Sequence, residues 1–419
     1  MIQGRADILI LGAGLQGAGV ALELARRGVS VTLLDRDALP LNRASLRNEG
    51  KIHLGLIYAN DPSLVTAFLQ LEGALRFRRI VARWLGPDVS WLALSHPFHY
   101  LVARDSVVAP DRLADHYAAV EERCRRLLEQ DADLDYLGER PRRLVRPLAE
   151  SEIATHFDPE RFSAGFATAE LAIDPDVLAV SLRRALADSP EVTFLPSRVV
   201  RAITEGPDGF RVEGDGVEGT WCLRARQVVN ATWERRLALD RQLGLHPPRD
   251  LLHRLKFRVI ARLPPELHEA PSVSMVLGRY GDVVIRSNGT AFLSWYPAGL
   301  RGWSNDIEPP ADWDFFCRGE IDPERARGIA ADTLAGIDAW FPGVSRGKPL
   351  IVDAGAIVAI GRSDVDDVAS ALHDRSRVGV TSRDGYHSVN PGKLTTAPLF
   401  ALQAAGRVEA FGVARKAVS

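Results

Sequence analysis

Cysteine is scarce in this sequence, and none of it is placed to pair or to bind a metal. Cys124, Cys222 and Cys317 are the three cysteines, and no two of them share a Cys-x-x-Cys spacing. An odd number of widely separated cysteines argues against a disulfide framework and against a structural zinc site. We therefore expect a reducing compartment and no metal.

Long apolar runs are missing as well. No stretch approaches the roughly 20 apolar residues that a membrane-spanning helix requires. Residues 1–7 lack the charged-then-apolar pattern of a secretory leader. We therefore expect a cytoplasmic protein with no transmembrane segment, while a peripheral membrane contact stays open.

Neither sign of charge is in excess: 52 basic residues stand against 54 acidic ones, a formal net charge of −2. Nucleic acid requires a basic surface, so we expect no nucleic-acid partner. The cluster of Arg76, Arg78 and Arg79 is interpreted as a solvated helix face. The hydrophobic content of 46% is that of an ordinary globular protein, and 419 residues suit two packed domains.

The first part of the chain predicts a strand–turn–helix–strand unit. Residues 8–11 have the apolar pattern of a buried strand, residues 20–27 that of a helix, and residues 29–34 that of a second strand. Gly28 follows the helix, as is common at a helix end. The unit has the length of a parallel strand–helix–strand crossover.

The turn of this unit carries a dinucleotide-binding pattern. Gly12, Gly14 and Gly17 have the Gly-x-Gly-x-x-Gly spacing between a strand and a helix. The first glycine permits a tight turn, the second lets the backbone approach a pyrophosphate, and the third lets the helix pack closely. Asp35 ends the second strand, where a carboxylate binds ribose hydroxyls and disfavours NADP. The alternative is a plain glycine turn beside a surface aspartate.

Later segments predict two kinds of structure. A helix over 177–187, strands over 192–195, 199–200 and 227–232, and a helix from Ala397 onward fit the same parallel sheet. Turn-separated segments predict antiparallel strands instead, at 98–102, 257–261, 283–286 and 292–296.

A second motif follows the second strand, and it carries a family resemblance. Its marker residues are Ser45, Asn48, Ile52, His53, Gly55 and Tyr58. Together with the Gly-Lys-Leu-Thr-Thr sequence of residues 392–396, this motif resembles the D-amino-acid oxidase superfamily of flavoenzymes. It is most similar to the glycerol-3-phosphate dehydrogenase and L-2-hydroxyglutarate dehydrogenase branches. Asn230, Ala231, Thr232 and Trp233 resemble a further family stretch that lacks its usual glycine here.

The resemblance implies FAD as the cofactor and an α/β fold, α+β overall. The expected architecture is a Rossmann-like FAD-binding domain of discontinuous segments with an antiparallel-sheet substrate cap. Its boundaries are expected at 1–85, 160–245 and 346–419 for the FAD-binding domain, and at 86–159 and 246–345 for the cap.

The resemblance also implies a set of cofactor-binding residues. Residues 45–53 would run past the pyrophosphate and under the flavin ring, and Lys393 would stabilise the reduced flavin near its N1–C2=O edge. Val199 and Val200 resemble an adenine contact but fit a core strand equally well. The full expected set is Gly12, Gly14, Leu15, Gln16, Gly17, Asp35, Arg36, Ala44, Ser45, Asn48, Glu49, Gly50, Lys51, Val199, Val200, Asn230, Ala231, Thr232, Gly392, Lys393, Leu394 and Thr395.

Three residues are candidates for catalysis. Oxidation of a CH–OH bond by hydride transfer to flavin N5 also releases a proton, and a histidine is suited to accept it. His53 is the first candidate, with a buried structural histidine as the alternative interpretation. His387 is the second, and Lys393 would act through its charge near the flavin.

Substrate-binding residues are expected on the cap strands. Lys256 and Arg258 alternate along one strand and would share a face, with Arg286 and Tyr296 on neighbouring strands. Exposed charges and core aromatics are the alternative. The glycerol-3-phosphate branch has a Gly-x-Arg after its last cap strand, whereas this sequence has Ile357 in that place and its nearest arginine at Arg362.

The expected function is therefore an FAD-dependent dehydrogenase or oxidase acting on the CH–OH bond of a small polar, hydroxy-acid-like metabolite. The expected partners are that small-molecule substrate and an electron acceptor of unspecified kind. Three alternatives stay open: a CH–NH oxidase of the same superfamily, an NAD-dependent reductase, and a redox-inactive flavin-binding scaffold. The sequence specifies neither covalent attachment of FAD nor an oligomeric state.

Overall fold

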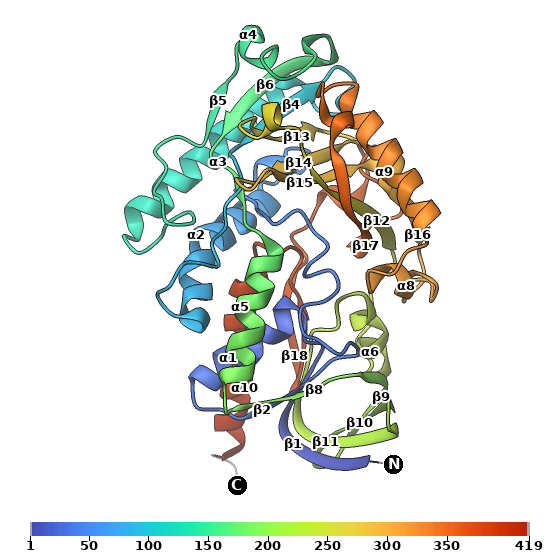
Figure 1. The fold of residues 1–419 in the computed structure, drawn as a ribbon. Coiled ribbons are helices and arrows are strands. Elements are labelled where there is room, and N and C mark those ends of the chain that lie inside the picture. The colour runs from blue at the N-terminus through green and yellow to red at the C-terminus, as the bar shows by residue number, and fades with distance from the viewer. Residues whose placement is uncertain (1, 417–419) are drawn as a thin grey trace.

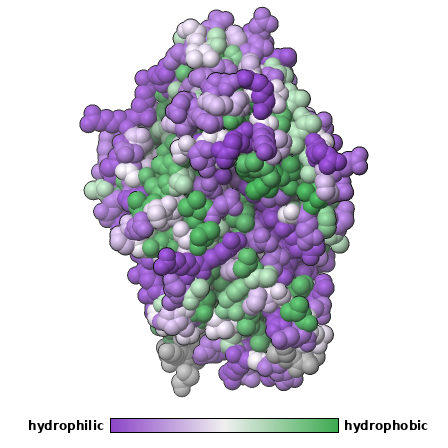
Figure 2. Space-filling model, viewed as in Figure 1, coloured by the Kyte–Doolittle hydropathy of each residue, from purple (hydrophilic) through white to green (hydrophobic). Residues whose placement is uncertain are grey.

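The computed structural model describes residues 2–416, which build two large β-sheets, each with its own helices (Figure 1). The lower part in Figure 1 contains both ends of the chain and the first sheet. The upper part contains the second sheet. Figure 2 shows a mainly hydrophilic face on which apolar residues gather toward the middle. No helix within residues 2–416 combines the length and apolar character needed to cross a bilayer.

The first sheet is mostly parallel. Its strand order is β18 (Gly379–Arg383), β19 (Tyr386–Asn390), β11 (Gly219–Asn230), β1 (Ile2–Leu11), β2 (Val31–Leu34) and β8 (Val192–Leu195). The strands β9 (Arg198–Gly206) and β10 (Gly209–Gly216) extend it as an antiparallel meander. Leu9, Ile10 and Leu11 are fully buried because this sheet is covered on both faces.

Helices cover one face of the first sheet. They are α1 (Leu15–Arg26), α2 (Val65–Leu85), α5 (Pro175–Asp188) and α10 (Ala397–Lys416), with α1 packed between α5 and α10. The short α6 (Arg236–Gln242) packs against β9. The helix α1 begins five residues earlier than the predicted 20–27, directly after the glycine turn. This extension brings its N-terminus to the carboxyl ends of β1 and β2.

The second sheet is mostly antiparallel. Its order is β16 (Leu300–Ser304), β12 (Leu251–Arg262), β15 (Thr290–Trp295), β14 (Gly281–Ile285), β13 (Ser272–Val276), β4 (Phe98–Ala103), β6 (Phe162–Thr168) and β5 (Val145–Pro147), with β17 (Lys348–Ile360) also paired to β12. The pair β4–β13 is parallel. The helix α9 (Pro323–Asp338) packs on this sheet through Leu334 and Ile337, while α3 (Pro110–Gln130) packs against α2.

Two strands correct the predicted domain boundaries. The strand β6 lies between β4 and β5, and β17 pairs with β12 from Lys348↔Arg262 to Ile360↔Leu251. Both strands belong to the second sheet, although the boundaries at 160 and 346 put them in the FAD-binding domain. An apolar strand pattern identifies a strand but not the sheet it joins, because pairing is decided by tertiary packing.

A two-stranded sheet lies between the two large ones. In it β3 (Lys51–Ile52) pairs with β7 (Leu171–Ala172). This pairing holds His53 next to Glu170, residues that are far apart in the sequence.

Candidate active site

A cavity of about 370 Å³ extends from the glycine turn of the first sheet to strands of the second. Its walls come from the segment 42–53, from the ends of β1, β2 and β11, and from strands β12, β14 and β15. The cavity therefore lies where the carboxyl ends of parallel strands meet the second sheet, the usual position of a ligand in such folds.

The glycine turn forms an anion-binding end of this cavity. Gly12 has a φ of +91°, and a Cβ there would lie 2.8 Å from the Ala231 carbonyl oxygen. Gly14 caps α1, no side chain caps that helix, and its first turn has no acidic residue. The partial positive charge of the helix end is thus free to act on a phosphate.

Asp35 completes this end of the cavity. Its carboxylate accepts hydrogen bonds from the backbone N–H groups of Ala13, at 2.6 Å, and Asp37, at 2.8 Å. Burial raises the pKa of Asp35, and these two bonds act in the opposite direction. An anion-binding turn beside an aspartate fits the pyrophosphate and ribose of a dinucleotide.

Most of the predicted cofactor residues line this cavity. They are Gly12, Gly14, Leu15, Gln16, Asp35, Arg36, Ala44, Ser45, Asn48, Glu49, Lys51, Val200, Ala231, Thr232, Gly392, Lys393 and Leu394. Ser45 accepts a hydrogen bond from the backbone N–H of Leu15 at 2.8 Å, which ties the second motif to the first helix turn.

The other five predicted cofactor residues lie behind the wall and do not line the cavity. A Cβ on Gly17 would lie 1.8 Å from the Gly12 oxygen, and one on Gly50 would lie 2.0 Å from the Ile173 oxygen, so both serve close backbone packing. Val199 lies on the opposite face of β9 from Val200, because side chains alternate along a strand.

Asn230 and Thr395 are used for internal hydrogen bonds. The Asn230 amide donates to Asp240 at 3.0 Å and to the Tyr386 hydroxyl at 2.7 Å. The Thr395 hydroxyl accepts from the His53 backbone N–H at 2.9 Å. Both residues thus position the wall rather than form its surface.

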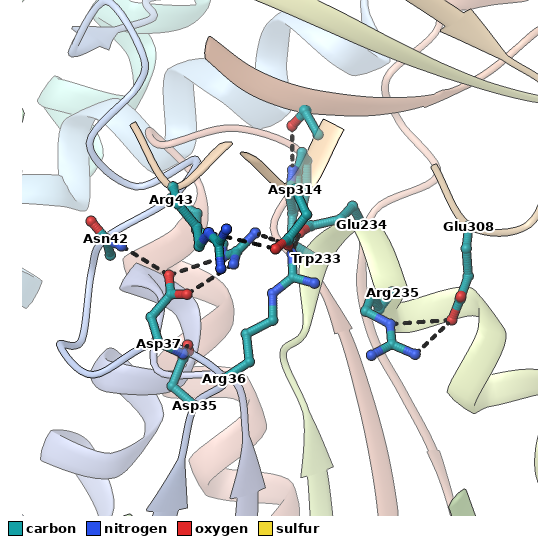
Figure 3. A network of polar contacts seen from close by, with 12 residues as sticks. Asp35, Arg36, Asp37, Asn42, Arg43, Trp233, Glu234, Arg235, Glu308 and Asp314 are labelled. Atoms are coloured by element: carbon teal, nitrogen blue, oxygen red, sulfur yellow. Dashed lines mark hydrogen bonds and ion pairs between the residues drawn. The ribbon is translucent and has the colours of Figure 1, made fainter. Parts of the chain in front are cut away.

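An ion-pair network borders the cavity and connects the two parts of the molecule (Figure 3). Arg43 pairs with Asp37 at 2.8 Å and with Asp314 at 2.7 Å. Arg36 lies 2.5 Å from Glu234 and 3.3 Å from Asp314. Asp314 is on α8 (Trp313–Cys317), which packs on β17, so it connects that helix to the loop after β2.

His53 is buried in the cavity wall between two carboxylates. Its Nε2 lies 3.6 Å from a Glu49 oxygen and its Nδ1 lies 3.6 Å from a Glu170 oxygen. Among the described residues neither nitrogen has a hydrogen-bond partner, although the side chain is only 4% exposed. The ring is therefore available to a ligand in the cavity.

Both neighbouring carboxyl groups are held ionised. Burial alone would raise the pKa of Glu49, but His53, Lys393 and Lys256 hold it well below its usual value. Burial likewise opposes ionisation of Glu170, yet His53 and Lys51 lower its pKa. The Glu170 carboxylate also accepts hydrogen bonds from the Leu54 N–H, at 2.7 Å, and the Tyr100 hydroxyl.

The predicted substrate residues divide into two groups. Lys256, Arg258 and Tyr296 line the cavity, and the Lys256 ammonium lies 4.6 Å from the Tyr296 ring centroid. The Arg258 guanidinium is paired with Asp353 at 2.6 Å. The prediction that Lys256 and Arg258 share a face is thus confirmed.

Arg286 and Arg362, the other two predicted substrate residues, do not line the cavity. Arg286 pairs with Asp174 at 3.1 Å, where β14 ends beside the start of α5. The Arg362 side chain is 78% exposed and pairs with Asp250 at 2.5 Å. In both cases a nearby aspartate holds the guanidinium outside the cavity.

His387, the second predicted catalytic residue, does not line the cavity. It lies in β19, with Nδ1 2.8 Å from the Ser382 hydroxyl and Nε2 3.1 Å from the Gln227 side-chain oxygen. Burial, with a contribution from Arg407, lowers its pKa to about 4. It is a neutral structural histidine behind the cavity.

Sequence reasoning missed several residues of the wall. Arg254 shares the alternation of Lys256 and Arg258 along β12, so that spacing was sufficient to find it. Asp282 and Arg375 also line the cavity. Arg375 lies in an irregular segment between β17 and β18 and carries no periodic signal.

Comparisons with known proteins agree with this architecture. The family model described as FAD dependent oxidoreductase, abbreviated DAO, matches residues 7–344. The solved glycine oxidase of Geobacillus kaustophilus has a TM-score of 0.68 and 17% identity, over 97% of this chain and 95% of that one. The L-α-glycerophosphate oxidase of Mycoplasma pneumoniae, solved with FAD bound, has a TM-score of 0.62 and 19% identity, over 97% and 95%.

Curated relatives match smaller regions. A tRNA 5-methylaminomethyl-2-thiouridine biosynthesis bifunctional protein from Chromohalobacter salexigens is 43% identical over 72 residues, 17% of this chain and 10% of that protein. The corresponding Thiobacillus denitrificans protein is 28% identical over 318 residues, 73% of this chain and 44% of the relative. The chain thus spans less than half the length of these relatives.

The family match covers most of the chain, and the family is FAD-dependent, so the alternative of an NAD-dependent reductase is set aside. The glycine turn, Asp35 and the segment 42–53 provide residues that suit this cofactor. The chain belongs to the DAO family of FAD-dependent oxidoreductases.

Proposed function

We propose that this oxidoreductase oxidises the CH–OH bond of a small anionic metabolite of the hydroxy-acid class, and that His53 accepts the hydroxyl proton. The observation that carries this proposal is the buried His53 ring, which lines the cavity with both nitrogens free of hydrogen bonds. An alcohol must lose a proton as it is oxidised, and a histidine is suited to receive it.

The two neighbouring carboxylates distinguish the two ring nitrogens of His53. Nδ1 faces Glu170, whose oxygens are already occupied by Leu54 and Tyr100. Nε2 faces Glu49 at the cavity surface. Nε2 is therefore the nitrogen that takes the proton, while Glu170 orients the ring.

The two parts of the molecule would bind different ligands. The residues around the first sheet, with Gly14, Asp35 and Lys393 among them, would hold FAD, and strands of the second sheet would hold the substrate. Bound FAD supplies the acceptor for the two electrons. An external electron acceptor then completes the cycle. Lys256 supplies positive charge for an anionic substrate.

Oxidation of a CH–NH bond is the second candidate, and two carboxylates favour it. Glu49 and Asp282 both line the cavity. Burial opposes ionisation of Asp282, but Lys51 and Lys256 lower its pKa, so both groups are anionic at neutral pH. Such a pair would attract a substrate ammonium.

Matched substrates separate the two candidates. The purified flavoprotein is mixed without oxygen with glycolate, L-lactate and L-malate, and in parallel with glycine, L-alanine and L-aspartate. Each pair differs only in hydroxyl against amine, and bleaching of the flavin absorbance reports oxidation. Oxidation of the hydroxy acids supports the proposal, whereas oxidation of the amines alone replaces it with the second candidate.

A His53→Ala variant tests the proton acceptor. We expect it to bind FAD normally and to turn over a hydroxy acid at least about 100-fold more slowly, since a positioned base contributes roughly that factor or more. The matched control is His387→Gln, which changes a histidine outside the cavity and should retain turnover. Unchanged turnover in the His53 variant would contradict the assignment.

A further inference from the structure

One irregular segment, residues 361–378, crosses from the second sheet to the first and covers part of the cavity. It follows β17 and precedes β18. Asp364 holds it through the Arg254 guanidinium, at 2.7 Å, and the Trp303 indole N–H, at 2.9 Å. Leu372 is 2% exposed and packs with Leu252. The segment is thus fixed at several points over the cavity.

Arg375 is held in this segment by contacts that leave most of its charge free. Its backbone N–H donates to the Thr66 hydroxyl at 3.0 Å, and its Nε donates to the Leu372 carbonyl at 2.8 Å. Within residues 2–416 no carboxylate oxygen lies within 4.0 Å of its guanidinium. The guanidinium lines the cavity with its two terminal nitrogens free to bind.

Most other cations of the cavity are already neutralised. Arg254 pairs with Asp364 at 2.7 Å, Arg258 with Asp353 at 2.6 Å, and Lys51 with Asp282 at 2.8 Å. An unpaired guanidinium in a partly buried position is costly unless a ligand supplies the negative charge. Arg375 is therefore placed for a ligand rather than for the fold.

A second unpartnered group lies near Arg375. The Tyr58 hydroxyl is buried, with its side chain 8% exposed, and has no hydrogen-bond partner among the described residues. Tyr58 lines the same cavity, and its ring lies edge-on to His53 with centroids 5.8 Å apart. A buried hydroxyl without a partner points to a ligand that accepts its hydrogen bond.

We propose that Arg375 binds the anionic group of the substrate, a carboxylate or a phosphate, with the Tyr58 hydroxyl as a second donor. The guanidinium offers two parallel N–H donors that match either group. Tyr58 connects this anion site to His53, so a substrate anchored at Arg375 presents its neighbouring carbon to the proton acceptor. The inference rests on the proposed function only in taking this cavity as the substrate site.

Binding of inert anions to the holoenzyme tests this assignment. Malonate and inorganic phosphate are titrated separately, and the change in flavin absorbance gives each dissociation constant. We expect the wild type to bind at least one of them and Arg375→Gln to bind it about 100-fold more weakly, as for loss of a charged hydrogen-bonding partner. The tighter of the two anions identifies the substrate group as carboxylate or phosphate.

Three variants keep the test decisive. Arg375→Lys keeps the positive charge but lacks the two parallel N–H donors, so it should bind the anion with intermediate affinity. Tyr58→Phe removes only the hydroxyl and should weaken binding about 10-fold, which covers the case in which Arg375→Gln fails to fold. Arg377→Gln changes an exposed arginine paired with Asp374 at 3.7 Å and should bind as the wild type does.

Two results would overturn the inference: a wild type that binds neither anion, or an Arg375→Gln variant that binds as tightly as the wild type. The outcomes also separate it from the proposed function. Arg375-dependent anion binding without oxidation of any hydroxy acid would leave this inference standing and remove the proposed function. Oxidation of hydroxy acids with unchanged KM in Arg375→Gln would do the reverse.

Discussion

The lysines that line the cavity differ in how closely a carboxylate pairs with each of them. Lys51 has Asp282 at 2.8 Å, whereas the nearest carboxylate to Lys393 is Glu49, at 4.0 Å. Burial lowers the pKa of Lys393 to about 8, and Glu49 acts in the opposite direction. Lys393 is therefore charged at neutral pH but loses its proton within the range that an assay can reach.

This property predicts an alkaline limit to activity. As the pH rises through about 8, Lys393 becomes neutral, and kcat/KM for an anionic substrate should fall. Arg in place of Lys393 stays charged, so Lys393→Arg should move the decline to higher pH, whereas Lys393→Met should lower kcat/KM throughout. The pH profiles of the three proteins provide the check, and identical alkaline limbs would contradict it.

At the scale of elements, α1 is fixed by a buried charge as well as by apolar packing. Glu23 has a fully buried side chain and pairs with Arg27 at 2.9 Å and Arg83 at 2.8 Å. The Trp84 indole N–H also donates to it, at 3.0 Å. Burial opposes ionisation, but Arg83, Trp84 and the neighbouring arginines lower the pKa of Glu23 to about 2.

The folded pKa lies below the ordinary value of 4.5, so Glu23 stabilises the fold above that pH and loses this effect as the pH falls toward about 2. Glu23→Gln should therefore lower the free energy of unfolding by roughly 2 kcal/mol at neutral pH. Urea unfolding at several pH values measures the difference, which should shrink as the pH falls below 4.5. A difference independent of pH would exclude the charge as its cause.

The loop after β2 and the helix α8 form a second connection between elements, through Asp314 and two arginines (Figure 3). These pairs border the end of the cavity that fits the ribose. Asp314→Asn should speed FAD release several-fold, since it loosens the covering loop, and high salt should speed release from the wild type for the same reason. Recovery of flavin fluorescence measures the rate.

The exposed neighbour Asp312 provides the control for this prediction. It caps α8 without a side-chain hydrogen bond, so Asp312→Asn should release FAD at the wild-type rate. Equal rates in the Asp314 and Asp312 variants would show that the network does not restrain the cofactor.

For the whole molecule, the sequence predicted what depends on local pattern. Local pattern predicted the first strand–turn–helix unit, and the fold confirms it. The family and the FAD cofactor were predicted from the resemblance carried by residues 45–58, 230–233 and 392–396, and the family match confirms them. His53 and Lys256 were found because a short motif and a strand alternation mark them. Their roles stay proposals.

What depends on long-range pairing was not predictable. The assignment of β6 and β17 to the second sheet is a matter of which strand each one meets. Arg286 and Arg362 lie outside the cavity because each guanidinium pairs with an aspartate that is distant in the sequence. Arg375 was missed because only the folded chain brings its irregular segment over the cavity.

The central position of β1 has a consequence for synthesis on the ribosome. In the pairing of β1 with β11, Ile2 lies opposite Trp221. More than half of the chain must therefore be synthesised before this edge of β1 can pair. Lys393 is translated later still. Because chains fold from the N-terminus as they emerge, the growing polypeptide holds an incomplete nucleotide site. We therefore expect FAD to bind only after the segment that contains Lys393 has been synthesised.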